Sequence, residues 1–144
     1  MTTFTQSQGA KSGALVTMGA LASDTYIASA AIDLGANIPL DSTFEVVATV
    51  TSPVSDKQVI LFAQLSLDGT DFTTGPTSGS SATDEADLHW IGTLPCNSTG
   101  THRKLFSLSG LPVAQHIKLV VRNRTGVTLT SGFVYRADIT GASA

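Results

Sequence analysis

Residues 57–67 read Lys57-Gln-Val-Ile-Leu-Phe-Ala-Gln-Leu-Ser-Leu67, and this stretch decides the fold class. Alternate residues would line one face of a β-strand, because successive side chains of a strand point to opposite sides. The second face also carries Ile60 and Phe62, and such nearly continuous apolarity predicts a strand that is buried on both sides. The Asp68-Gly69 pair that follows predicts a turn. The first face would carry Val59, Leu61, Ala63, Leu65 and Leu67.

The same two-residue period recurs along most of the chain. Residues 43–52 alternate cleanly and end before Pro53, because proline cannot donate to a β-ladder. Residues 25–34 are rich in alanine and also permit a helix, although a helix that ended at Gly35 would be short. Further strands are predicted at residues 14–18, 87–94, 103–109, 115–122 and 128–139.

About eight short strands with regular turn signals predict an all-β protein, an antiparallel two-sheet β-sandwich of jelly-roll-like type. An immunoglobulin-like sandwich is the alternative, but its Cys…Trp…Cys framework is absent. The single cysteine, Cys96, is expected to act as a small buried hydrophobic residue. We expect one sandwich domain over residues 14–144. The N-terminal arm, residues 1–13, is expected to become ordered on a neighbouring molecule.

Composition favours a protein that assembles with others. Charged residues make up 13% of the 144 residues, whereas a typical soluble domain carries about 25%. A subunit that covers much of its surface against neighbours needs little charge, although a lightly charged, threonine-rich β-protein would look the same. The net charge of −3 argues against general nucleic-acid binding. Neither a signal peptide nor a membrane-spanning run is expected from the sequence.

The charges are distributed unevenly along the chain. Up to Thr101 there are ten acidic and two basic residues, whereas from His102 onward there are six basic residues and one acidic residue. Such an asymmetry could bring unlike patches of neighbouring copies together. Alternatively, the strands interleave in space and the two signs mix on every face.

The longest predicted loop covers residues 73–86, and loops of this length are usually functional or mobile. Asp84, Glu85 and Asp87 form an acidic cluster at its end. Their spacing fits no calcium loop, so a solvated acidic tip is the simpler interpretation. His89 would share a strand face with Asp87, whereas His102 and His116 are interpreted as strand-edge residues.

No nucleophile elbow, phosphate-binding loop or dinucleotide fingerprint occurs in the sequence. We therefore predict no catalytic residues, no metal, no cofactor and no enzyme activity. Asn97-Ser-Thr-Gly100 and Asn123-Arg-Thr-Gly126 spell glycosylation acceptors but are interpreted only as turns. The aromatic rings of Tyr26, Trp90 and Tyr135 lie in predicted strands, where packing in the core is expected.

Two stretches of the chain resemble small virion proteins of tailed bacteriophages. They are Val59-Ile-Leu-Phe-Ala-Gln-Leu-Ser-Leu-Asp-Gly-Thr-Asp-Phe72 and Leu119-Val-Val-Arg-Asn-Arg-Thr-Gly-Val-Thr-Leu-Thr-Ser-Gly132. The overall pattern of residues 40–140 is similar to that of head decoration, or cement, proteins. The resemblance implies a jelly-roll-like domain on the exterior of the capsid, made in the host cytoplasm. It implies the major capsid protein and further copies of the chain, as a dimer or trimer, as partners, without nucleic acid or membrane.

Residues 1–13 and 73–86 are natural bridging elements for such a protein. The predicted interface residues are Phe4, Lys11, Asp84, Glu85, Arg103, Lys104 and Arg124. Two other functions stay open. One is a module of the phage tail or fibre that binds host glycan or another tail protein. The other is a small hydrolase that uses His89.

Overall fold

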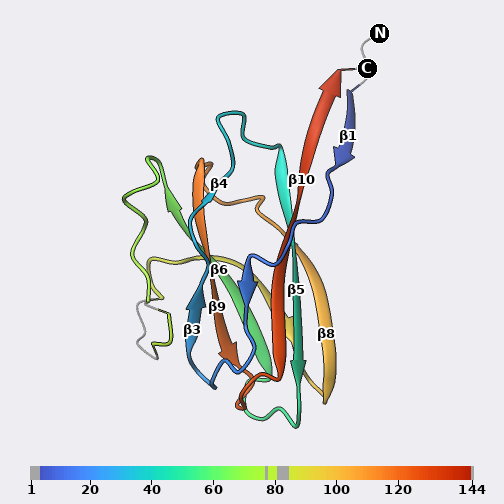
Figure 1. Cartoon of the computed structure of the whole chain (residues 1–144), viewed down its shortest axis with the longest axis vertical. Coiled ribbons are helices and arrows are strands. Elements are labelled where there is room, and N and C mark those ends of the chain that lie inside the picture. The colour runs from blue at the N-terminus through green and yellow to red at the C-terminus, as the bar shows by residue number, and fades with distance from the viewer. Residues whose placement is uncertain (1–3, 77, 81–84, 144) are drawn as a thin grey trace.

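The computed structural model describes residues 4–76, 78–80 and 85–143, and this part of the chain is all-β. Ten strands pass along one elongated sandwich (Figure 1). The first four are short, and the last six provide the framework. Their bounds are β1 Phe4–Gln8, β2 Val16–Thr17, β3 Tyr26–Ala28, β4 Ile32–Asp33, β5 Asp41–Val50, β6 Gln58–Ser66, β7 His89–Pro95, β8 Gly100–Ser107, β9 His116–Arg124 and β10 Ser131–Ser143.

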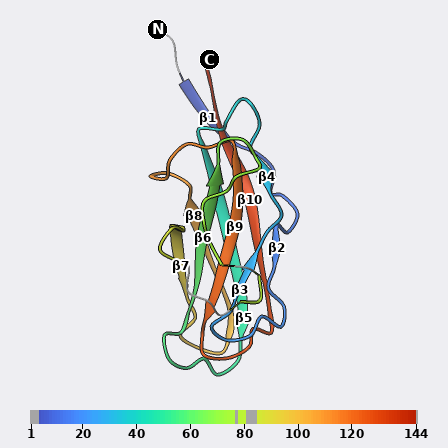
Figure 2. The same cartoon turned by 90° about the vertical axis from the view of Figure 1, so that its left-hand side faces the viewer.

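The strands form two antiparallel sheets of five strands each, which lie side by side in Figure 1 and overlap in Figure 2. Sheet A has the order β1-β10-β5-β8, with β2 also paired to β10, and sheet B has the order β3-β9-β6-β7, with β4 also paired to β9. If β1 and β2 count as one interrupted strand, and β3 and β4 as another, the orders become 1-8-3-6 and 2-7-4-5. This is the jelly-roll order, so the predicted β-sandwich class is confirmed.

The core lies between the sheets and follows the predicted alternation. Phe44, Val46, Ala48 and Val50 of β5 are buried, and so are the four inward residues of β6 from Val59 to Leu65. Leu67 breaks the predicted pattern, because β6 ends at Ser66 and the leucine side chain is 87% exposed. Cys96 is buried as expected, and burial raises the pKa of its thiol to about 11.

Residues 25–34 form two short strands rather than a helix. Ser29 lies between them, and its backbone N–H donates to the Leu119 carbonyl of β9 at 2.8 Å. The Ser29 Oγ accepts from the Leu119 N–H at 2.9 Å, so the break between β3 and β4 keeps contact with β9. At the break between the two strands, the Ser29 hydroxyl accepts the hydrogen bond from the Leu119 N–H that a backbone carbonyl would accept in a continuous ladder.

The prediction that Trp90 packs in the core is wrong. The register between β6 and β7 shifts at Leu61/Phe62, which places Trp90 opposite Phe62 on the outer face of sheet B. The indole is 59% exposed, and its Nε1–H donates to the Thr93 hydroxyl at 3.2 Å. Tyr26, by contrast, is buried, and Tyr135 is half-buried.

A second, smaller hydrophobic cluster covers the outer face of sheet B. Tyr26, Phe62 and Val120 form its centre, and Leu88 packs against them. Residues 78–80 run beside β3, where the Gly79 N–H donates to the Tyr26 carbonyl at 2.6 Å and the Tyr26 N–H donates to the Ser80 carbonyl at 3.1 Å. Residues 78–80 of the long loop therefore lie against the β3 edge of sheet B. Within the described residues, no helix has the length and apolarity required to cross a membrane.

Candidate protein interaction surface

Large apolar side chains are exposed at one end of the sandwich, around the segments that join β4 to β5, β6 to β7 and β8 to β9. Leu67 is 87% exposed, Val113 76%, Leu40 67% and Ile38 38%. We call this surface, together with Pro112, the apolar end. Exposed apolar residues are ordinary when they are scattered, but a group of them at one end is typical of an interaction site.

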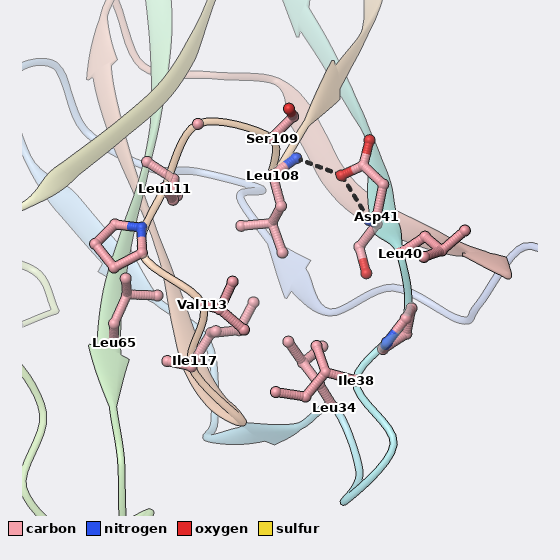
Figure 3. A pocket seen from close by; sticks show the side chains of 15 residues that line it. Leu34, Ile38, Leu40, Asp41, Leu65, Leu108, Ser109, Leu111, Val113 and Ile117 are labelled. Carbon is pink, nitrogen blue, oxygen red and sulfur yellow. Dashed lines mark hydrogen bonds between the residues drawn. The ribbon is translucent and has the colours of Figure 1, made fainter. Parts of the chain in front are cut away.

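The apolar end is hollowed on both sides of Val113. One hollow, of about 250 Å³, lies between residues 34–42 and 108–114, with Leu34, Leu65 and Ile117 of the core as its floor (Figure 3). A neighbouring hollow of about 410 Å³ is lined by Leu65, Leu67 and His89 among others. Pro112 and Val113 line both. The surface therefore offers an apolar projection between two recesses, and the lining of the larger one also includes Asp68, Asp71 and His89.

Asp41 fixes the wall of the first hollow. Its Oδ1 accepts from the Leu108 N–H at 3.1 Å and from the Ser42 N–H at 2.8 Å, as the dashed lines in Figure 3 show. The Ser107 hydroxyl donates to Oδ2 at 2.5 Å. The carboxylate therefore joins the start of β5 to the end of β8, and its role in the hollow is to hold the shape of the wall.

A charged and aromatic patch lies on the outer face of sheet A and contains two of the predicted interface residues. Lys11 Nζ lies 2.8 Å from Glu45 Oε1, and Arg103 Nη1 lies 3.3 Å from the same oxygen. The hydrogen bond from Lys11 is the main reason that the pKa of Glu45 is lowered. Lys11 also lies 4.0 Å from the centre of the Tyr135 ring, which packs beside Phe133. The arm is thereby held on its own sheet.

Glu85 binds a buried arginine that the sequence analysis did not single out. Arg122 lies on the outer face of sheet B, where its guanidinium is 2.7 Å from Glu85 Oε1 and 2.7 Å from Asp24 Oδ1. The Tyr26 ring centre is 5.1 Å from the guanidinium carbon. In the sequence, the alternation of residues 115–122 places Arg122 on the same strand face as Val120. This alternation is the signal from which the position of Arg122 could have been predicted. This cluster anchors the end of the long loop, so Glu85 is part of a structural contact.

The Tyr26 hydroxyl provides a pH test of this cluster. Burial, followed by the nearby Glu85 carboxylate, raises the pKa of Tyr26 to about 12 from 10.0. Below pH 10 the hydroxyl is protonated in both the folded and the unfolded chain. Between pH 10 and pH 12 it ionises first in the unfolded chain, so stability falls by about 2 kcal/mol over this range. Urea unfolding at a series of pH values should show this loss in the wild type and a smaller one in Tyr26→Phe; equal losses would contradict the assignment.

The remaining predicted interface residues do not join these groups in one surface. Phe4 begins β1 opposite Ser143. Asp84 lies outside the described residues. Lys104 is exposed on β8, with Nζ 5.5 Å from the centre of the Phe106 ring. Arg124 forms an ion pair with Asp56 beside the far end of β6.

The histidines are also dispersed. His89 is half-buried beside the larger hollow, His116 contacts the Gly69 turn, and His102 Nε2 lies 2.7 Å from the Ser98 carbonyl oxygen. Among the residues that the structure describes, no three His, Cys, Asp or Glu side chains are grouped to hold a metal ion. No protein-family model matches the sequence, and a search of curated proteins also finds no match.

Proposed function

We propose that this chain is a structural protein of a tailed-bacteriophage virion, a decoration protein that binds the outside of the capsid and bridges neighbouring major capsid proteins. The observation that carries the proposal is the apolar end, where Val113 and its neighbours are exposed around two hollows. A protein that stabilises a shell needs a surface that fits its partner and needs no reaction chemistry. Repetition over the shell makes each weak contact effective through avidity.

The apolar end has the composition expected at the centre of an interface. Such centres are poor in charge, and a few buried apolar anchors provide most of the binding energy. The acidic side chain in the wall of the first hollow, Asp41, is already hydrogen-bonded, so a partner that fills this hollow would leave no unpaired charge there. The jelly-roll topology and the resemblance to virion proteins support the same assignment.

The test uses capsids stripped of outer proteins, prepared from the phage that encodes the chain. We expect the wild-type protein to bind them saturably in a sedimentation assay. Val113→Asp would place a charge among the apolar anchors and should weaken binding about 100-fold, equivalent to about 2.7 kcal/mol. Val54→Asp is the matched control, because this valine is also exposed, at 50% against 76% for Val113, but lies at the other end of the sandwich, between β5 and β6. Absence of wild-type binding, or equal losses in both variants, would reject the proposal.

Exposure of Trp90 favours a second candidate, the tail or fibre module that binds host glycan. Sugar-binding sites often present an aromatic ring to solvent, and the indole lies on the outer face of sheet B with its N–H held by Thr93. A glycan-array signal that is lost in Trp90→Ala, together with absence of capsid binding, would make this function the preferred one.

A further inference from the structure

The two ends of the chain form a two-stranded extension of sheet A. Strand β1 pairs with the last residues of β10, from Phe4 opposite Ser143 to Gln8 opposite Ile139. The pairing of β10 with β5 stops at Ile139, opposite Asp41. Residues 4–8 and 139–143 therefore project beyond the sheet, as Figures 1 and 2 both show. We call these residues the terminal ribbon.

The outer edge of β1 carries free backbone groups. The Gly9 N–H donates to the Asp138 carbonyl at 2.9 Å, so this pair is hydrogen-bonded. Hydrogen-bonded and non-bonded pairs alternate along an antiparallel ladder. The backbone groups of Thr5 and Ser7 therefore face β10, and those of Gln6 and Gln8 face outward. Among the described residues, β1 pairs with β10 and with no other strand.

The edges formed by β8, β7 and β3 carry features that discourage pairing with another chain, whereas the sequence of β1 has none. Strand β8 carries Arg103 and Lys104, and β7 has the register shift and ends at Pro95. Residues 78–80 cover β3. Charge, proline and bulges are the usual means of protecting an edge. The sequence of β1, Phe-Thr-Gln-Ser-Gln, contains no charge, no proline and no glycine.

The terminal ribbon also lacks the support that an isolated pair of strands needs. Thr5, Gln6, Ser7 and Gln8 are exposed, and so are Thr140 and Gly141 opposite them. Two strands without a buried face are only marginally stable in water, and further strands stabilise them. On one face of the ribbon, Leu40 lies close to Gly141. A further strand that paired with the outer edge of β1 would give the ribbon the support that it lacks.

We propose that β1 pairs antiparallel with β1 of a second copy of this chain, about a two-fold axis at Gln6. In this register Gln6 faces Gln6 of the other copy, and Phe4 faces Gln8, each as a hydrogen-bonded pair. The strand is neutral, so self-pairing brings no like charges together. The contact is isologous and closes as a dimer. Because the ribbons project, the two sandwiches lie on opposite sides of the joined sheet. This inference does not depend on capsid binding.

The test measures the mass of the purified full chain by light scattering over a range of concentrations. We expect the wild type to reach twice its mass of 14.9 kDa. Gln6→Pro removes an outward N–H but leaves the intrachain ladder intact, so its mass should remain that of the monomer. Gln6→Ala keeps the backbone donor and should dimerise like the wild type. Hydrogen exchange gives a second measurement, because the Gln8 amide should be protected in the wild type and exposed in Gln6→Pro.

Opposite charges at the central position test the register. Gln6→Lys alone and Gln6→Glu alone should each be monomeric, because like charges would face each other across the axis. An equimolar mixture of the two variants should recover the mass of a dimer. A wild type that is monomeric at all concentrations, a trimer or larger assembly, or a dimer that survives Gln6→Pro would overturn the proposal.

Discussion

Replacement of Asn123 by alanine is expected to lower the free energy of unfolding by about 4 kcal/mol, most of the stability of a marginally stable domain. Asn123 is buried at the end of β9. Its Nδ2 donates to the carbonyl oxygens of Leu21 at 2.9 Å and Val127 at 2.8 Å. Its Oδ1 accepts from the N–H and the hydroxyl of Thr125, at 3.0 and 2.7 Å. Alanine would leave all of these buried groups without this partner.

Asn97→Ala is the matched control for this prediction. Asn97 opens the other Asn-x-Thr/Ser turn of the chain, but its side chain is exposed. Its replacement should change stability by no more than about 0.5 kcal/mol, as is usual at the surface. Urea unfolding of both variants provides the comparison. Equal effects of the two substitutions would show that the hydrogen bonds of Asn123 contribute no more than those of an ordinary turn.

Gly92→Ala is expected to destabilise the protein by about 3 kcal/mol, although it adds only one methyl group. Gly92 lies on β7 opposite Leu61, and the Phe106 ring of β8 occupies the space beside it. A Cβ at position 92 would lie 2.0 Å from Phe106 Cδ1 and 2.8 Å from Cγ. The whole ring would have to leave its position, and the edge of the core between β7 and β8 would open.

A double-mutant cycle measures whether this contact is the cause. On a Phe106→Ala background the clash is absent, so Gly92→Ala should then cost less than about 1 kcal/mol. Gly13→Ala is a further control, because no atom lies within 4 Å of the added methyl group. If Gly92→Ala is as mild as Gly13→Ala in the wild-type background, the packing described for Phe106 is wrong.

Much of the framework followed from residue alternation. Residues 43–52 and 57–67 alternate so regularly that the positions of β5 and β6 were predicted within two residues. The burial of Cys96 followed from its place beside an apolar run. These features depend on the two-residue period of a strand, which acts over neighbouring positions and is visible in a single sequence.

The candidate site was predicted less completely. Lys11 and Arg103 were named as interface residues, but their common partner Glu45 was not. The three residues are distant in the sequence, and only the order of the strands in sheet A brings them together. The apolar end was missed, since Leu40, Leu67 and Val113 stand far apart in the sequence. Each lies in a separate connection, and only the fold brings these connections to one end.

The sequence by itself determined the class of the fold, most of its strands after residue 13 and the low content of charged residues, because these depend on local period and composition. Only the tertiary structure decided which residues are exposed together. A one-residue shift in β7 moved Trp90 to the surface, and pairing across β9 buried Arg122 and Asn123. The physical reason is that burial depends on partners distant in the chain, and a change of register moves a side chain to the other face.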